Sequence, residues 1–168
     1  MATISRGIVI SASEYSRHFF EDCIKSIKTD YPIYVCWEGI GRPTGSFELG
    51  AIKRGAELFD EFVYLHDTVV IKDNNLFDKL FAIDGHVLLT SGVFHYFGKY
   101  ISNDLPIIPN VTNKEEAVYW ELNWFKKPHS VFYEELPVIT EKFEDKYGRT
   151  NMVLENSYLI KWKARRLS

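Results

Sequence analysis

The sequence has few cysteines and lacks the common metal-binding spacings. Its 168 residues include two cysteines, Cys23 and Cys36, which is too few for a disulfide framework and gives no paired zinc ligands. The five histidines show no HExxH or other metal-binding spacing. We interpret both cysteines as buried thiols in a reducing compartment, and we therefore expect a cytoplasmic protein.

Long apolar runs and an excess of one charge are also missing. No apolar run approaches the roughly 18 residues of a membrane span, and the first residues lack the apolar core of a signal peptide. The 20 basic and 23 acidic residues leave a net charge of −3, so nucleic acid is not indicated as a partner. With 46% hydrophobic residues, a chain of one-domain length can bury a core.

The first 90 residues alternate between strand-like and helix-like segments. Short apolar strands are predicted at 7–11, 33–37, 62–65 and 87–89, with helical spacing or capping signals between them. The unbroken apolar run at 62–65 favours a strand that is buried on both faces. This alternation predicts an α/β fold around a mostly parallel sheet.

The second half of the chain is less regular. An aromatic, glycine-containing stretch at 92–101 is interpreted as a loop. Asn113 is predicted to cap a helix that opens with Glu115 and Glu116. Residues 152–163 alternate as a strand would.

The polar triplet His66-Asp67-Thr68 directly follows the 62–65 run. Because parallel sheets bind ligands at the carboxyl ends of their strands, Asp67 is a candidate for holding a metal ion or a substrate. The alternative is that Asp67 merely starts a turn.

The order of these segments resembles the nucleotide-sugar-binding half of a GT-A-fold glycosyltransferase. In that fold a helix with a small-residue pattern precedes a strand that ends in an Asp-x-Asp motif. Here the helix is 48–56, and the strand ends in His66-Asp67-Thr68. The resemblance covers roughly residues 7–125. It implies a three-layer sandwich of Rossmann-like GT-A type, formed as a single domain over residues 1–168, with 1–90 as the nucleotide-binding part and 91–168 as the acceptor part and C-terminal segment.

The family motif normally supplies two carboxylates for a metal ion that bridges the diphosphate, and this triplet supplies one. The resemblance implies Mn²⁺ or Mg²⁺ held by Asp67, with diphosphate oxygens and water as further ligands. His66 would suit manganese better than magnesium. The alternative for His66 is a hydrogen-bonded histidine at a strand end.

The resemblance also assigns residues to the nucleotide. Ser11, Ala12 and Ser13 stand where such enzymes contact the base and ribose, and Glu38 closes the second strand, where an acid commonly meets them. Alternatively, the serines only cap the following helix, and Glu38 is an exposed acid.

Four cations are candidates for the diphosphate. Lys53 and Arg54 lie on the helix after the glycine-rich loop, where the alternative is a solvated helix face. Lys161 and Lys163 stand where a late residue of the fold reaches back and adds charge stabilisation. For this second pair the alternative is a solubilising basic tail.

The acceptor side needs a general base in an inverting enzyme. Glu115 and Glu116 fit that place, and Glu116 fits a capping box equally. The sequence thus predicts a hexosyl or pentosyl transferase that uses a nucleotide-diphosphate sugar, UDP-sugar favoured, and an unknown acceptor. The alternative is a non-catalytic GT-A-like domain that binds a sugar nucleotide or a protein partner. A nucleotidyltransferase would need a glycine-rich basic signature that the segment after Ser11 lacks.

Overall fold

The protein forms two sheets and three α-helices within the residues that its computed structural model describes, which are 4–40, 47–82, 87–90, 93–97, 113, 115–116, 119, 152–155 and 157–162. Along the chain the elements are β1 (Arg6–Ala12), the 3-10 turn η1 (Glu14–Ser16), α1 (Arg17–Ser26), β2 (Ile33–Trp37), α2 (Phe47–Leu58), β3 (Glu61–His66), β4 (Val69–Ile71), α3 (Asn75–Phe81), β5 (Val87–Thr90), β6 (Val93–Phe97), β7 (Met152–Glu155) and β8 (Leu159–Trp162).

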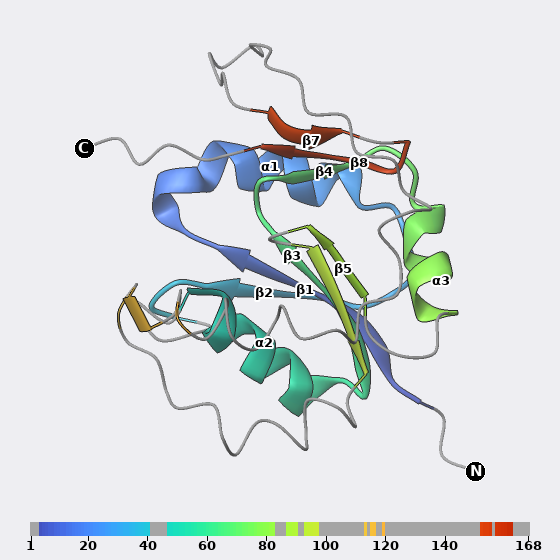
Figure 1. Cartoon of the computed structure of the whole chain (residues 1–168), viewed down its shortest axis with the longest axis horizontal. Coiled ribbons are helices and arrows are strands. Elements are labelled where there is room, and N and C mark those ends of the chain that lie inside the picture. Colours follow the sequence, from blue (N-terminus) through green and yellow to red (C-terminus); the bar gives the residue numbers. More distant parts are fainter. Residues whose placement is uncertain are drawn as a thin grey trace.

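The larger sheet has five strands in the order β2-β1-β3-β6-β5 (Figure 1). β1 pairs in parallel with both β2 and β3. β6 pairs antiparallel with β3 and with β5, so β5 runs in the same direction as β3. The predicted α/β fold with a largely parallel sheet is therefore confirmed, and β6 is the reversed strand.

The second sheet is antiparallel and has the order β4-β8-β7 (Figure 1). The chain enters it from β3 through a tight turn at Asp67 and Thr68, so the two sheets meet at that turn. α1 ties β4 in place, because the Ser26 hydroxyl accepts a hydrogen bond from the Ile71 amide at 2.9 Å. A strand from the far end of the chain, β8, is thereby fixed next to the carboxyl end of β3.

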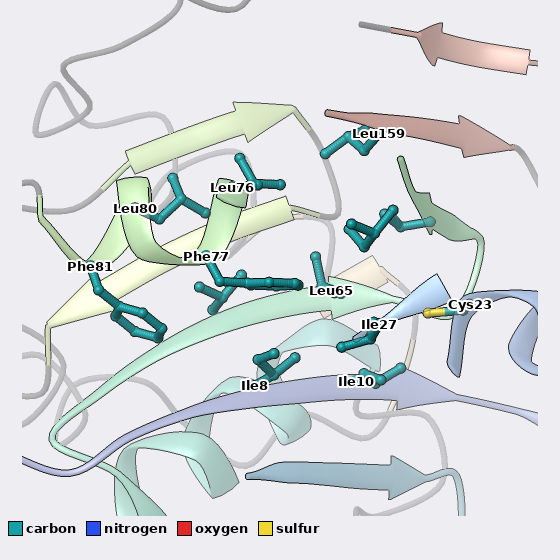
Figure 2. Packing of buried hydrophobic residues seen from close by; sticks show 13 residues of the cluster. Ile8, Ile10, Cys23, Ile27, Leu65, Leu76, Phe77, Leu80, Phe81 and Leu159 are labelled. Atoms are coloured by element: carbon teal, nitrogen blue, oxygen red, sulfur yellow. The ribbon is translucent and has the colours of Figure 1, made fainter. Parts of the chain in front are cut away.

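Helices cover both faces of the larger sheet. Alternate residues of β1 and β3, among them Ile8, Ile10 and Leu65, pack with α1 and α3 in the main core (Figure 2). On the opposite face α2 approaches so closely that a Cβ on Gly55 would lie 2.7 Å from the Phe62 ring. Residues 62–65 are all 0% exposed, which confirms the prediction of a strand buried on both faces.

Three local predictions were wrong. The stretch at 92–101 contains the strand β6, which pairs antiparallel with β3. Residues 152–163 form the paired strands β7 and β8 in place of one strand. The alternative in which the Ser13 side chain caps the following helix is wrong, because that segment begins as the 3-10 turn η1 and the Ser13 side chain makes no capping hydrogen bond.

Both cysteines are buried thiols, as predicted. Burial raises the pKa of the Cys23 thiol well above its ordinary value. Among the described helices, none is long and apolar enough to cross a membrane.

Candidate functional site

The candidate site lies where three separate segments meet at the carboxyl ends of β1 and β3. The β3–β4 turn contributes Asp67 and Thr68, the start of the first helical segment contributes Ser13 and Ser16, and β8 contributes Lys161. β1 fixes the turn, since the Asp67 amide donates to the Ser11 carbonyl at 3.0 Å. The parallel pairing of β1 with β3 thus places the turn beside the start of the helix.

The Asp67 carboxylate is buried, with 6% of the residue exposed. Its Oδ2 atom accepts hydrogen bonds from the Ser13 amide at 3.4 Å and from the Ser16 hydroxyl. Burial raises the pKa of the Asp67 carboxyl above its ordinary value. Hydrogen bonds from Ser16 and Ser13 offset part of that rise, as does the nearby positive charge of Lys161. Asp67 is therefore both the start of a turn and a fixed hydrogen-bond acceptor at the site.

Lys161 is buried next to Asp67, with 7% of the residue exposed. Its ammonium donates to the Thr68 hydroxyl and to the Trp162 carbonyl at 3.1 Å. The third contact is 3.2 Å to Nδ1 of His66. Because an ammonium can only donate, Nδ1 is the acceptor there. The alternative of a solubilising tail is wrong for Lys161, whose three donors all lie inside the protein.

The register of the second sheet explains why Lys161 points inward. Lys161 stands opposite Val69 in the β4–β8 pair, and the Trp162 amide donates to the Thr68 carbonyl at 3.0 Å. Leu159, two residues earlier on the same face of β8, is part of the main core. The lysine stem therefore extends that core, and its ammonium reaches the polar turn at the end of it.

The residues predicted for the base and ribose lie close to this cluster, and their hydroxyls are already engaged. Ser11 is bonded to the Tyr64 hydroxyl at 2.9 Å, and the Ser13 hydroxyl to that of Ser16 at 2.9 Å. Ala12 is 1% exposed. What this segment can offer a ligand is therefore chiefly its backbone.

Glu38 stands at the carboxyl end of β2, beside the Ala12 end of β1. Its amide donates to the Ala12 carbonyl at 2.9 Å, which continues the parallel pairing. The preceding residue, Trp37, is half-buried, with the Arg17 guanidinium 5.1 Å from its ring centre. The structure thus brings Glu38 to the same edge as Asp67 and adds an aromatic ring and a cation there.

The other predicted cations are not part of the cluster as described. Arg54 lies on α2, on the opposite face of the sheet from α1, where it pairs with Glu57 at 2.7 Å and contacts the Tyr34 hydroxyl at 3.5 Å. Lys53 is the preceding residue of the same helix. Lys163 lies outside the described residues.

The predicted bases lie in a helical turn on the surface. Glu115 and Glu116 are both exposed, and the Glu116 amide donates to the Asn113 side chain at 2.9 Å. The predicted capping role of Asn113 is thereby confirmed. Neither carboxylate makes a hydrogen bond or ion pair with another described residue, so their role as a base stays a prediction.

Five residues at this edge were not among the predicted site residues: Ser16, Arg17, Trp37, Tyr64 and Thr68. The signal for Ser16 was its place three residues after Ser13, which brings the two hydroxyls together on one helical turn. The resemblance gives Thr68 no role, because Thr68 stands where the family motif has its second carboxylate. Nothing in the sequence singled out Tyr64 within its apolar run.

The donor atoms around Asp67 do not fit a divalent cation well. Mg²⁺ and Mn²⁺ need several oxygen ligands, yet His66 and Thr68 already accept from Lys161, and Asp67 Oδ2 already accepts twice. Across the described part of the chain, no three or more His, Cys, Asp or Glu side chains gather as a metal site. Mn²⁺ or Mg²⁺ at Asp67 therefore stays a prediction that these contacts do not favour.

The cluster combines a buried carboxylate, a buried ammonium and an aromatic ring along one edge of a parallel sheet. Such an edge can hold a ligand that carries both a ring and anionic groups. Comparison of the chain with family models, with curated proteins and with solved structures found no match.

Proposed function

We propose that the protein is a small glycosyltransferase of Rossmann-like, three-layer GT-A type that binds a nucleotide-diphosphate sugar at the carboxyl ends of β1, β2 and β3. One observation carries the proposal: the Lys161 ammonium contacts His66 and Thr68, which lie 95 and 93 positions away in the sequence. Open α/β sheets bind ligands at this edge, and the cation arrives there from a separate sheet.

The proposed donor lies along the edge with its diphosphate toward Lys161. Because the hydroxyls of Ser11 and Ser13 are engaged, the base and ribose contact the backbone of that segment together with Glu38 and Trp37. An indole ring supplies a stacking surface, and a carboxylate accepts hydrogen bonds from ribose hydroxyls. UDP-sugars are the favoured donors, and the acceptor is an unidentified hydroxyl compound.

The proposed reaction transfers the sugar to the acceptor in one displacement. The acceptor oxygen bonds to the anomeric carbon, and the bond from that carbon to the diphosphate oxygen breaks with its electron pair left on the diphosphate. The proton of the acceptor hydroxyl passes to Glu115 or Glu116. The charge of Lys161 stabilises the negative charge that develops on the leaving diphosphate.

A non-catalytic binding domain is the second candidate. The observation that favours it is the engagement of Asp67, whose Oδ2 already accepts from Ser13 and Ser16. A domain of this kind would hold a sugar nucleotide at the same edge, or a protein partner, without breaking the glycosyl bond.

Donor turnover and binding together separate these functions. The purified protein is incubated with UDP-sugars, and released UDP is measured by anion-exchange chromatography, with the Glu115→Gln, Glu116→Gln double variant as control. Melting temperature is measured in parallel with UDP, ADP, GDP and CDP, because a ligand of the folded state raises it. UDP release that the control lacks supports the transferase. A melting shift without release supports the binding domain, and no shift with any nucleotide overturns both sugar-nucleotide functions.

A further inference from the structure

The position of Lys161 relative to the triplet His66-Asp67-Thr68 supports a further inference about how the proposed site binds a diphosphate. Its ammonium contacts the side chains on both sides of Asp67, namely Nδ1 of His66 at 3.2 Å and the hydroxyl of Thr68. These are the two positions at which an Asp-x-Asp motif would present its carboxylates. A protein cation thus occupies the space between the side chains that would otherwise face a metal ion.

The lysine is held there firmly. Backbone pairing of β8 with β4 sets its position, and its third hydrogen bond goes to the Trp162 carbonyl at 3.1 Å. None of the three acceptors of the ammonium is a carboxylate. The carboxyl group of Asp67 nevertheless lies near enough to interact with the ammonium. These contacts fix the Lys161 side chain at a site where 7% of the residue is exposed.

A divalent cation bound to the same triplet would lie next to this ammonium. Like charges at such a separation repel strongly in a buried setting, because the effective dielectric constant is low. The metal would also have to displace Lys161 from His66 and Thr68 to gain its ligands. An anionic group meets the opposite situation, since the charge of the ammonium attracts it.

We infer that Lys161 takes the place of a divalent cation at this site, so that the protein binds the diphosphate of its nucleotide without metal. The inference rests on the proposed binding of a nucleoside diphosphate. It differs from the expectation drawn from the Asp-x-Asp resemblance, in which Asp67 holds Mn²⁺ or Mg²⁺. Asp67 serves here to fix the start of the helix and to balance the charge of the lysine.

The first test compares UDP binding to the unaltered protein with EDTA and with Mn²⁺, by isothermal titration calorimetry. We expect dissociation constants that agree within about threefold. Electron paramagnetic resonance of free Mn²⁺ gives an independent readout, and its signal should not fall when the protein is added without nucleotide. Both measurements use the natural sequence, so they do not depend on whether a variant folds.

The second test removes the charge. Lys161→Met keeps an apolar stem of similar length, and we expect UDP affinity in EDTA to fall at least about tenfold, since the attraction between the ammonium and the diphosphate is lost. Lys161→Arg keeps the charge and should retain more of the affinity. Lys72→Met is the matched control: Lys72 is adjacent to β4 in the same sheet region and pairs with Glu155 at 2.8 Å, so its loss should leave affinity unchanged.

The outcomes separate the inference from the proposed function. UDP binding that requires Mn²⁺ overturns the inference and leaves the proposed function standing. Metal-free binding that a folded Lys161→Met variant retains in full also overturns the role of Lys161. No UDP binding in either condition overturns both. Metal-free binding that depends on Lys161 and not on Lys72 supports the inference.

Discussion

The two ends of the β1–β3 pair both carry charged groups, and they are built differently. At the amino end Arg6 stands directly opposite Glu61 and pairs with it at 2.8 Å, with 40% of the Arg6 side chain exposed. At the carboxyl end Asp67 and Lys161 are 6% and 7% exposed. The neighbouring strands β1 and β3 supply both residues of the Arg6–Glu61 pair. The carboxyl end also needs β8, a strand from the far end of the chain, because β8 carries Lys161.

The two ends differ in the free energy that is needed to bury their charged groups. In the Arg6–Glu61 pair the arginine side chain stays 40% exposed although Glu61 is buried, so water still reaches one partner and screens the pair. Buried polar groups are costly unless every partner is present, and the carboxyl end assembles those partners from β3, β8 and the start of the helix. Functional sites are where proteins retain such costly clusters, which is why we place the ligand at this end.

The largest expected effect is on turnover, and it tests the general base that the reaction proposed for the carboxyl end requires. Glu115 and Glu116 point about 100° apart on a helix, so only one of them can serve as the proposed base. We expect one of the single glutamine substitutions to lower turnover at least about a hundredfold with little change in melting temperature. Steady-state UDP release measures it.

The matched control for turnover is Asp60→Asn at the amino end. Asp60 accepts hydrogen bonds from the Ser5 amide and hydroxyl at 2.8 and 3.2 Å, far from the proposed site along β3, and its substitution should leave turnover within about twofold. If both glutamine variants also stay within a few-fold of the parent, the base lies elsewhere.

The next effect is on stability, and it compares the two ends directly. Asp67→Ala removes the acceptor of the buried Ser13 amide and leaves the Ser16 hydroxyl only its contacts with Ser13, so we expect a loss of roughly 1–3 kcal/mol in the free energy of unfolding. Asp60→Ala frees groups that water can reach, and its loss should be at most about 1 kcal/mol. Urea unfolding of both variants provides the measurement, and equal losses would contradict the proposed contrast between the ends.

The sequence was sufficient to predict the strand that leads to the site. The apolar run at 62–65 shows burial on both faces, and a polar triplet after it indicates the strand end. The approach of Lys161 could not be predicted in the same way. Both faces of β8 carry apolar residues, Leu159 on one and Ile160 on the other, so periodicity alone does not identify the buried face.

The aromatic stretch at 92–101 shows a second limit of sequence patterns. Its residues fit a loop that binds sugars as well as they fit a strand, because aromatic side chains favour both. Only pairing with β3, a contact between distant segments, distinguishes them. Local sequence therefore predicted the elements with strong apolar patterns and missed those that depend on tertiary pairing.

A smaller effect concerns pH. The pKa of Asp67 is raised in the folded protein by burial, so the folded state holds this proton more tightly than the unfolded chain does. Stability from this group is complete below the ordinary carboxyl pKa and is lost as the pH rises through the raised pKa of the folded state. We therefore expect the free energy of unfolding of the parent to fall relative to Asp67→Asn over that interval. Urea unfolding of both proteins at successive pH values measures the difference, and a parent that gains stability with rising pH would show that hydrogen bonds outweigh burial at Asp67.

The smallest effect belongs to the exposed end. In a double-mutant cycle of Arg6→Met and Glu61→Gln, we expect a coupling energy of about 1 kcal/mol or less, because the arginine side chain is 40% exposed and water screens the pair. Raising the salt concentration should reduce the coupling further. Urea unfolding of the four proteins at low and high salt gives both values. A coupling of several kcal/mol that resists salt would mean that Glu61, with 10% of its side chain exposed, behaves as a buried charge. The two ends of the β1–β3 pair would then have different partners but a similar free-energy cost of burying their charged groups.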